Sequence, residues 1–271
     1  MVLRDMPIEE FAKTLTIIVG GEIVETKRVN GVTAMCITKD CDSSLRPMVH
    51  VKPLYDDYIN DKITMADAAS YILRIFEAQA PIYDTDIYDY GKIRRKIVAR
   101  LYNQINDFDI SVSAKDYGFD DLILVPYIEN VIKNGSIRVD SKFLSLWGVT
   151  KDELMENAFN NIDCEIANMF DILRNRIPEE SLTDIPRFSM YVISNHDKCF
   201  GANAILKAYD ALKKIFPKGY IVLPSSLHEV IAVELIEWDE YKDYLTEIIN
   251  DVNKTELNRK DWLSDKLYSF K

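Results

Sequence analysis

One short segment of the chain combines the groups that hydrolases use. It reads Pro224-Ser225-Ser226-Leu227-His228-Glu229, so hydroxyls, an imidazole and a carboxylate follow one another closely. Side chains two residues apart in a strand share a face, but they do not ordinarily form the hydrogen bond that activates a nucleophile. No Gly-x-Ser-x-Gly turn accompanies the segment. We therefore favour a structural turn at the start of a strand, and a hydrolase built on Ser225, Ser226, His228 and Glu229 is the alternative.

A second set of side chains could bind zinc. Cys36 and Cys41 lie close together in the sequence, and His196 and Cys199 form another close pair. The chain lacks the Cys-x-x-Cys spacing that makes such a site well defined, and Cys36 lies in an alternating strand pattern where a small side chain packs. The sequence therefore favours four ordinary cysteines, with zinc as the less favoured alternative.

Sites for other cofactors are not indicated by the sequence. The glycine-rich phosphate loops Gly-x-x-x-x-Gly-Lys-Ser/Thr and Gly-x-Gly-x-x-Gly do not occur. The acids at 84–91 have the wrong register for a calcium loop. We predict no cofactor.

Charge is spread unevenly along a chain whose formal net charge is −11. Residues 55–90 hold 8 acids and 2 bases, and residues 152–184 hold 9 acids and 2 bases. An acidic field repels phosphate, so direct binding of nucleic acid is disfavoured, whereas a basic protein would be attracted. Such charge most often serves solubility alone, and the more specific interpretation is a surface that binds a basic protein partner. The candidate contact residues are Asp152, Glu153, Glu156, Asp163 and Glu165, together with the tyrosines Tyr83, Tyr88 and Tyr90.

The segment 91–100 has the opposite charge, because it holds five bases and no acid. Such a run could contact phosphates or an acidic partner, but it more often forms ion pairs within its own protein. We expect internal pairing with the abundant acids.

Hydrophobic periodicity predicts a mixture of helices and hairpins. Residues 7–19 and 64–79 have helical spacing, and the strands 22–28 and 32–38 flank Asn30-Gly31, a strong hairpin signal. Pro126 within the apolar run 122–132 indicates an edge strand or a bulge. The predicted fold class is therefore α+β, with antiparallel sheets built from hairpins and helices packed on one face. We expect an N-terminal α-β-β-β-α subdomain over 1–90 and a C-terminal α+β subdomain over 91–271.

Composition is that of a folded protein without a membrane anchor. Hydrophobic residues make up 48% of the chain, and no apolar run approaches the roughly 20 residues that cross a bilayer. The first residues carry acids where a signal peptide would carry bases, and the cysteine spacing does not suggest disulfides. We expect a cytoplasmic protein.

The C-terminal half carries runs that resemble a known family. The most specific are Pro-Ser-Ser-x-His-Glu-Val-Ile from Pro224, Val-Asn-x-Thr from Val252 and Leu-Ser-Asp-x-x-Tyr from Leu263; others lie at 143–150, 190–195 and 201–202. The chain resembles an uncharacterised family from Clostridia and related Firmicutes, described only as a domain of unknown function, and more distantly the YtpQ-type proteins of bacilli. Leu227 departs from the isoleucine of the pattern, and residues 103–120 match nothing in it.

This resemblance implies a biological setting and no established activity. Such proteins are associated with conjugative elements and prophages, which implies an accessory or anti-defence role. Together with the acidic charge, it leads us to expect a non-enzymatic binding protein of a bacterial mobile element that engages a basic, nucleic-acid-handling protein. The hydrolase remains the alternative, and the oligomeric state is not predicted.

Overall fold

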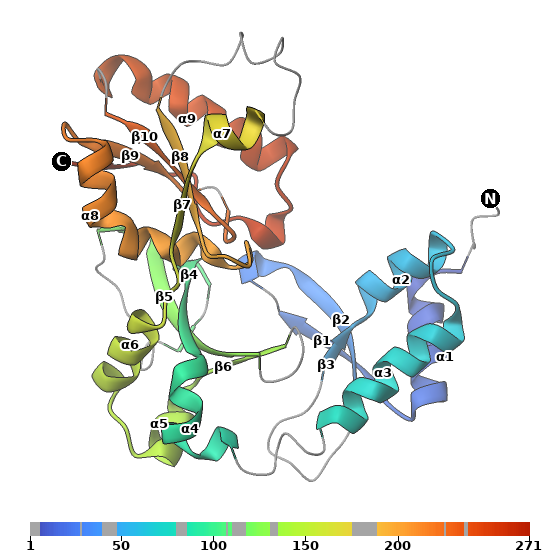
Figure 1. Ribbon diagram of the computed structural model, residues 1–271. Helices are drawn as coiled ribbons and strands as arrows, with labels where there is room; N and C mark the ends of the chain where they lie inside the picture. Colours follow the sequence, from blue (N-terminus) through green and yellow to red (C-terminus); the bar gives the residue numbers. More distant parts are fainter. Residues whose placement is uncertain are drawn as a thin grey trace. The chain divides into compact units, whose positions relative to one another are not determined.

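The computed structural model divides the chain into two compact units (Figure 1). Unit 1 comprises Met1–Lys92 and Asn130–Gly135, and unit 2 comprises Ile93–Glu129 and Ser136–Lys271. The residues described are 6–27, 29–39, 48–79, 86–106, 108–109, 118–130, 135–174, 189–224, 226–235 and 238–271.

The described part of unit 1 combines one small antiparallel sheet with helices on both sides of it in the sequence. The chain runs through α1 (Ile8–Val19), β1 (Glu22–Lys27), β2 (Thr33–Thr38), β3 (Met48–His50), α2 (Val51–Ile59) and α3 (Met65–Gln79), and the sheet order is β1-β2-β3. Asn30 and Gly31 have φ angles of 63° and 70°, the left-handed conformation that a tight hairpin turn requires. The predicted order lacked α2, which follows β3 directly.

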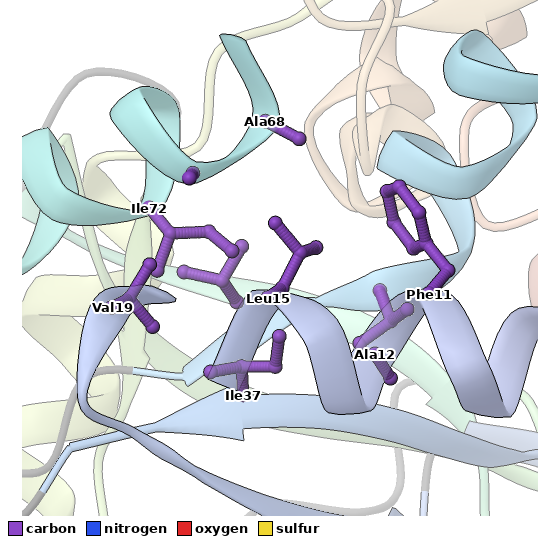
Figure 2. Close-up of a cluster of buried hydrophobic side chains, with 10 residues drawn as sticks. Phe11, Ala12, Leu15, Val19, Ile37, Ala68 and Ile72 are labelled. Carbon is purple, nitrogen blue, oxygen red and sulfur yellow. The ribbon is translucent and has the colours of Figure 1, made fainter. Parts of the chain in front are cut away.

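The core of unit 1 lies between its helices and one face of the sheet (Figure 2). Phe11 and Leu15 of α1 meet Ile72 of α3 and Ile37 of β2, and all four are fully buried. Thr64 Oγ1 accepts a hydrogen bond from Asp67 N, while Asp67 Oδ2 accepts from Thr64 N. This reciprocal cap fixes the start of α3.

Unit 2 begins with a three-stranded antiparallel sheet. After α4 (Tyr90–Ile93) and a short 3-10 turn at Arg94–Lys96 come β4 (Ile97–Asn103), β5 (Leu122–Glu129) and β6 (Ser136–Arg138), in the order β4-β5-β6. The expectation of an edge strand at Pro126 is wrong, because β5 is central. Pro126 lies where β6 has ended, and its carbonyl still accepts a bond from Val139 N. The missing N–H of Pro126 therefore removes only the hydrogen bond at the end of the β5–β6 pair.

The second sheet of unit 2 has five antiparallel strands in the order β11-β9-β10-β8-β7. These strands are β7 (Glu165–Asn168), β8 (Met190–Ser194), β9 (Tyr220–Leu223), β10 (Val230–Glu234) and β11 (Tyr268–Phe270). The accompanying helices are α5 (Ser141–Trp147), α6 (Lys151–Asn160), α7 (Met169–Arg174), α8 (Ile205–Ile215) and α9 (Trp238–Thr255). Asp140 caps α5 and Thr150 caps α6.

The predicted fold class is confirmed. Every paired strand in the described part of the chain is antiparallel, and the helices are interspersed between hairpins and not in a regular βαβ series. Among the described residues, no helix is both long enough and apolar enough to span a bilayer.

Candidate functional site

The segment with the candidate catalytic residues forms the connection between β9 and β10. Leu227 is buried, and its N–H donates to Asp261 O at 2.8 Å. Ser226 forms an isolated bridge with Trp262. Ser225 lies outside the described residues. The segment is therefore held by the chain at 261–262.

The imidazole of His228 is occupied on both nitrogens. Nδ1 accepts a hydrogen bond from Phe200 N at 3.2 Å, which assigns the ring proton to Nε2, and Nε2 lies 3.3 Å from Asp261 Oδ1. Ser226 Oγ accepts from His228 N at 3.0 Å. In a catalytic triad a serine hydroxyl would take the place that Phe200 N–H occupies here. Glu229 is exposed, and Asp261 is the acid beside the ring. This geometry favours the turn interpretation.

A second loop is tied to the same turn. Ser194 Oγ donates to His228 O at 2.7 Å, and Gly201 N donates to that oxygen at 3.1 Å. A Cβ on Gly201 would lie 2.4 Å from Ser194 Oγ and 2.5 Å from Asn195 N, so only glycine fits. The runs at 190–195, 201–202 and 224–229 thus hold one another in place.

The two runs from Val252 and Leu263 also meet in space. Asn253 Nδ2 donates to Asp265 Oδ1 at 2.6 Å, and Ser264 Oγ donates to Asp121 Oδ2 at 2.8 Å. Tyr268 OH donates to Asp121 Oδ1. Burial, followed by this bond to a carboxylate, raises the pKa of Tyr268 well above its usual value. These contacts hold the segment before β11 against the start of β5.

An open depression of about 410 Å³ lies over this network. Lys266 in its wall pairs with Asp120 at 2.9 Å. The wall contains two acids and two lysines. Because these charges balance, they favour neither an anionic nor a cationic ligand. Its lining residues are Gly118, Asp120, Lys242, Thr246, Asp265, Lys266, Leu267 and Tyr268.

A buried ion pair in unit 2 is the main feature that sequence inspection missed. Arg100 of β4 donates from Nε to Glu129 Oε1 at 2.7 Å and from Nη2 to Oε2 at 2.8 Å. Its guanidinium carbon lies 4.3 Å from the ring centre of Tyr127 and 3.8 Å from that of Phe200. Burial lowers the pKa of Arg100, but hydrogen bonds and charge interactions with Glu129 and Tyr102 together outweigh this and raise the pKa overall. The same Phe200 supplies the N–H that fixes His228.

Only part of the basic segment 91–100 therefore forms ion pairs within the protein. Arg100 is paired, whereas Arg94, Arg95 and Lys96 are exposed. Within the described ranges, no hydrogen bond or ion pair involves the side chains of these three residues.

The candidate zinc ligands fall in different units. Cys36 is buried in unit 1, and its Sγ lies 3.0 Å from Nδ1 of His50, its direct partner across the β2–β3 pair. Cys41 lies outside the described residues. In unit 2, His196 pairs with Asp163, and Cys199 is exposed. Among residues that the structure describes, no group of three or more His, Cys, Asp or Glu side chains could hold a metal.

The structure divides the five candidate acids into two groups. Asp163 pairs with His196, and Glu165 pairs with Lys198 at 2.5 Å, so both are partly neutralised. Asp152, Glu153 and Glu156 are exposed on α6, and within the described ranges no side-chain bond or ion pair involves their carboxylates.

The candidate tyrosines are not equally accessible. Tyr88 is 41% exposed at the end of a 3-10 turn (Asp86–Tyr88), Tyr90 is half-buried, and Tyr83 lies outside the described residues. Only Tyr88 among those described presents an exposed ring.

The fold and the site together define an α+β protein with two units built on antiparallel sheets. In unit 2 the polar groups around His228 are hydrogen-bonded to one another. The chain belongs to a family of unknown function, DUF5688, whose model matches residues 9–271. Neither the curated proteins nor the solved structures gave a match to it.

Proposed function

We propose that the protein is a binding protein that engages a basic segment of another protein through the acidic face of α6. The acidic face comprises Asp152, Glu153 and Glu156. The observation that carries this proposal is that three neighbouring carboxylates are exposed without internal ion pairs in the described structure, on a helix whose orientation is fixed.

The geometry of α6 supports a rigid acidic surface. Leu154, Met155 and Ala158 are buried on one side of the helix. At 100° per residue the acids fall on the opposite side, facing solvent. Thr150 Oγ1 caps the first turn by accepting from Glu153 N at 3.2 Å. Because the helix is packed and capped, its carboxylates lose little freedom when a partner binds.

Two of these acids also have a local role. Asp152 and Glu153 lie in the first turn of α6, where negative charge stabilises the exposed N–H groups of the helix. Glu156 lies beyond that turn and has no such role. An exposed acidic surface raises the association rate with a basic partner and makes the binding sensitive to salt.

The geometry gives the hydrolase alternative no support at Ser226, because both nitrogens of His228 are already engaged and the serine oxygen faces the backbone. A binding role therefore fits the described side chains better.

The resemblance supports a proposal for the kind of partner. The association with conjugative elements and prophages that the resemblance implies suggests a cytoplasmic accessory of the anti-defence type. Its partner would be a nucleic-acid-handling protein, since such proteins carry basic surfaces that bind phosphate.

The test compares two variants with the same change in net charge. One replaces the acidic face (Asp152→Asn, Glu153→Gln, Glu156→Gln). The other replaces three exposed acids of α9 (Asp243→Asn, Glu247→Gln, Asp251→Asn). Immobilised protein is incubated with lysate of a bacterial host at low salt, and retained proteins are identified by mass spectrometry.

We expect wild-type protein and the α9 variant to retain the same basic protein, and the α6 variant to lose it. Raising the salt to about 0.5 M should release it, because the screening length falls well below 10 Å. Equal retention by all three proteins, or retention of no basic protein at low salt, contradicts the proposal.

A further inference from the structure

The 3-10 turn between α4 and β4 carries a basic surface that the proposed function does not use. Arg94, Arg95 and Lys96 follow one another in this turn, and all three are exposed. We call these three residues the basic turn. Its charges have no internal partner in the described structure, so they are open to an external one.

The basic turn is fixed to the same helix that carries the acidic face. Asn157 Nδ2 and Asn161 Nδ2 donate to Arg94 O at 2.6 and 2.7 Å, and Asn161 Nδ2 also lies 2.8 Å from Ile97 O. Both asparagines lie at the C-terminal end of α6, whereas the acids begin at its second residue. Since a helix rises 1.5 Å per residue, the middle of the acidic face lies roughly 8 Å along α6 from the two asparagines that hold the basic turn.

We propose that a second copy of this chain docks on this surface, with two α6 helices antiparallel across a two-fold axis. The acidic face of each copy then meets the basic turn of the other. A two-fold arrangement repeats every contact, so three carboxylates meet three cations twice.

Charge complementarity favours a second copy over nucleic acid. A phosphate backbone at the basic turn would be repelled by the acidic face on the same helix and by a chain of net charge −11. A second copy pairs both surfaces at once, and these local ion pairs oppose the repulsion between two chains of net charge −11. The dimer uses the acidic face of the proposed function, so a basic partner would compete with it.

Sedimentation velocity at about 20 mM and about 500 mM salt tests the proposal with purified chain. One variant reverses the basic turn (Arg94→Glu, Arg95→Glu, Lys96→Glu). A second reverses the acidic face (Asp152→Lys, Glu153→Lys, Glu156→Lys). Circular dichroism establishes that each variant folds.

We expect a dimer of wild-type protein at low salt that dissociates at high salt. Each variant alone should dimerise at least about tenfold more weakly, because like charges then face each other. An equimolar mixture of the two variants should dimerise again, since each supplies the charge that the other lacks. If the second variant fails to fold, two results still test the proposal: the loss of dimer in the first variant, and the salt dependence of the wild-type dimer.

A wild-type monomer at low salt up to about 100 µM overturns the inference. So does a dimer that neither reversal weakens, or a mixture that stays monomeric. Binding of a labelled DNA duplex that the reversed basic turn abolishes would also overturn the choice of a second copy. The variant with the reversed basic turn keeps its acidic face, so its retention of a basic protein tests the proposed function separately.

Discussion

Removal of the Glu129 carboxylate tests how far the buried ion pair stabilises unit 2. Arg100 has a side chain only 8% exposed, held between two aromatic rings, and Glu129 supplies two charge-assisted hydrogen bonds to it. In Glu129→Ala the guanidinium stays buried without a counter-charge. Loss of one partner of a fully buried pair costs about 3–5 kcal/mol. Because the Glu129 side chain is 28% exposed, water can partly replace it, and we expect a loss of about 3 kcal/mol.

Urea unfolding followed by tryptophan fluorescence measures this loss. The tryptophans Trp147, Trp238 and Trp262 all belong to unit 2, so the signal reports on that unit. In thermal unfolding the midpoint should fall by roughly 6–12 °C, at about 2–4 °C per kcal/mol for a domain of this size. Glu247→Ala, an exposed acid on α9 of the same unit, serves as control and should change stability by no more than about 0.5 kcal/mol.

The double substitution Arg100→Met with Glu129→Met separates the cost of an unpaired buried charge from the contribution of the ion pair itself. It removes the buried charge together with its partner, so it should cost less than Glu129→Ala alone. A loss below about 1 kcal/mol in Glu129→Ala, with an unchanged dependence on urea, would refute the argument that this pair anchors β4 to β5.

Three further predictions concern other contacts. Thr64→Ala removes the cap of α3, and the free energy of unfolding of unit 1 should fall by about 1 kcal/mol, measured by circular dichroism at 222 nm. Tyr268→Phe leaves Asp121 with one donor fewer, so unit 2 should lose roughly 1.5–3 kcal/mol in the fluorescence assay. Hydrogen bonding to Asp163, then its charge, raises the pKa of His196, and in Asp163→Asn an NMR titration should show that pKa falling back toward about 6.5. Protonated His196 is favoured in the folded state, so its contribution to stability is present at low pH and is lost as the pH rises through the raised pKa.

Much of the fold could be predicted because its signals are local. The cap at Thr64, the turn at Asn30 and the cap at Thr150 depend on neighbours within a few residues. The helix α2 was missed because Pro53 interrupts its pattern, although proline is tolerated in the first turn. Strands such as β11 were missed because three residues carry too little alternation to be recognised.

The site was harder to predict because its contacts join distant parts of the chain. Nothing near His228 in the sequence indicates that Phe200 N–H and Asp261 would take its two nitrogens. Likewise, the sequence does not show that His50 lies opposite Cys36 or that Glu129 reaches Arg100. Such partners depend on strand register and tertiary packing, which one sequence does not reveal.

The bonds between Asp121 and the segment at 264–268 affect how the protein folds during synthesis. Asp121 leaves the ribosome well over a hundred residues before Tyr268, its hydrogen-bond partner. Until then β9 lacks β11 on one side, and its exposed edge could pair with other nascent chains. At elongation rates of about 5–20 residues per second, Tyr268 emerges roughly 7–30 seconds after Asp121, and the edge of β9 stays exposed for roughly 2–10 seconds of that time. Chaperone binding to nascent chains should therefore persist until the residues of β11 have emerged.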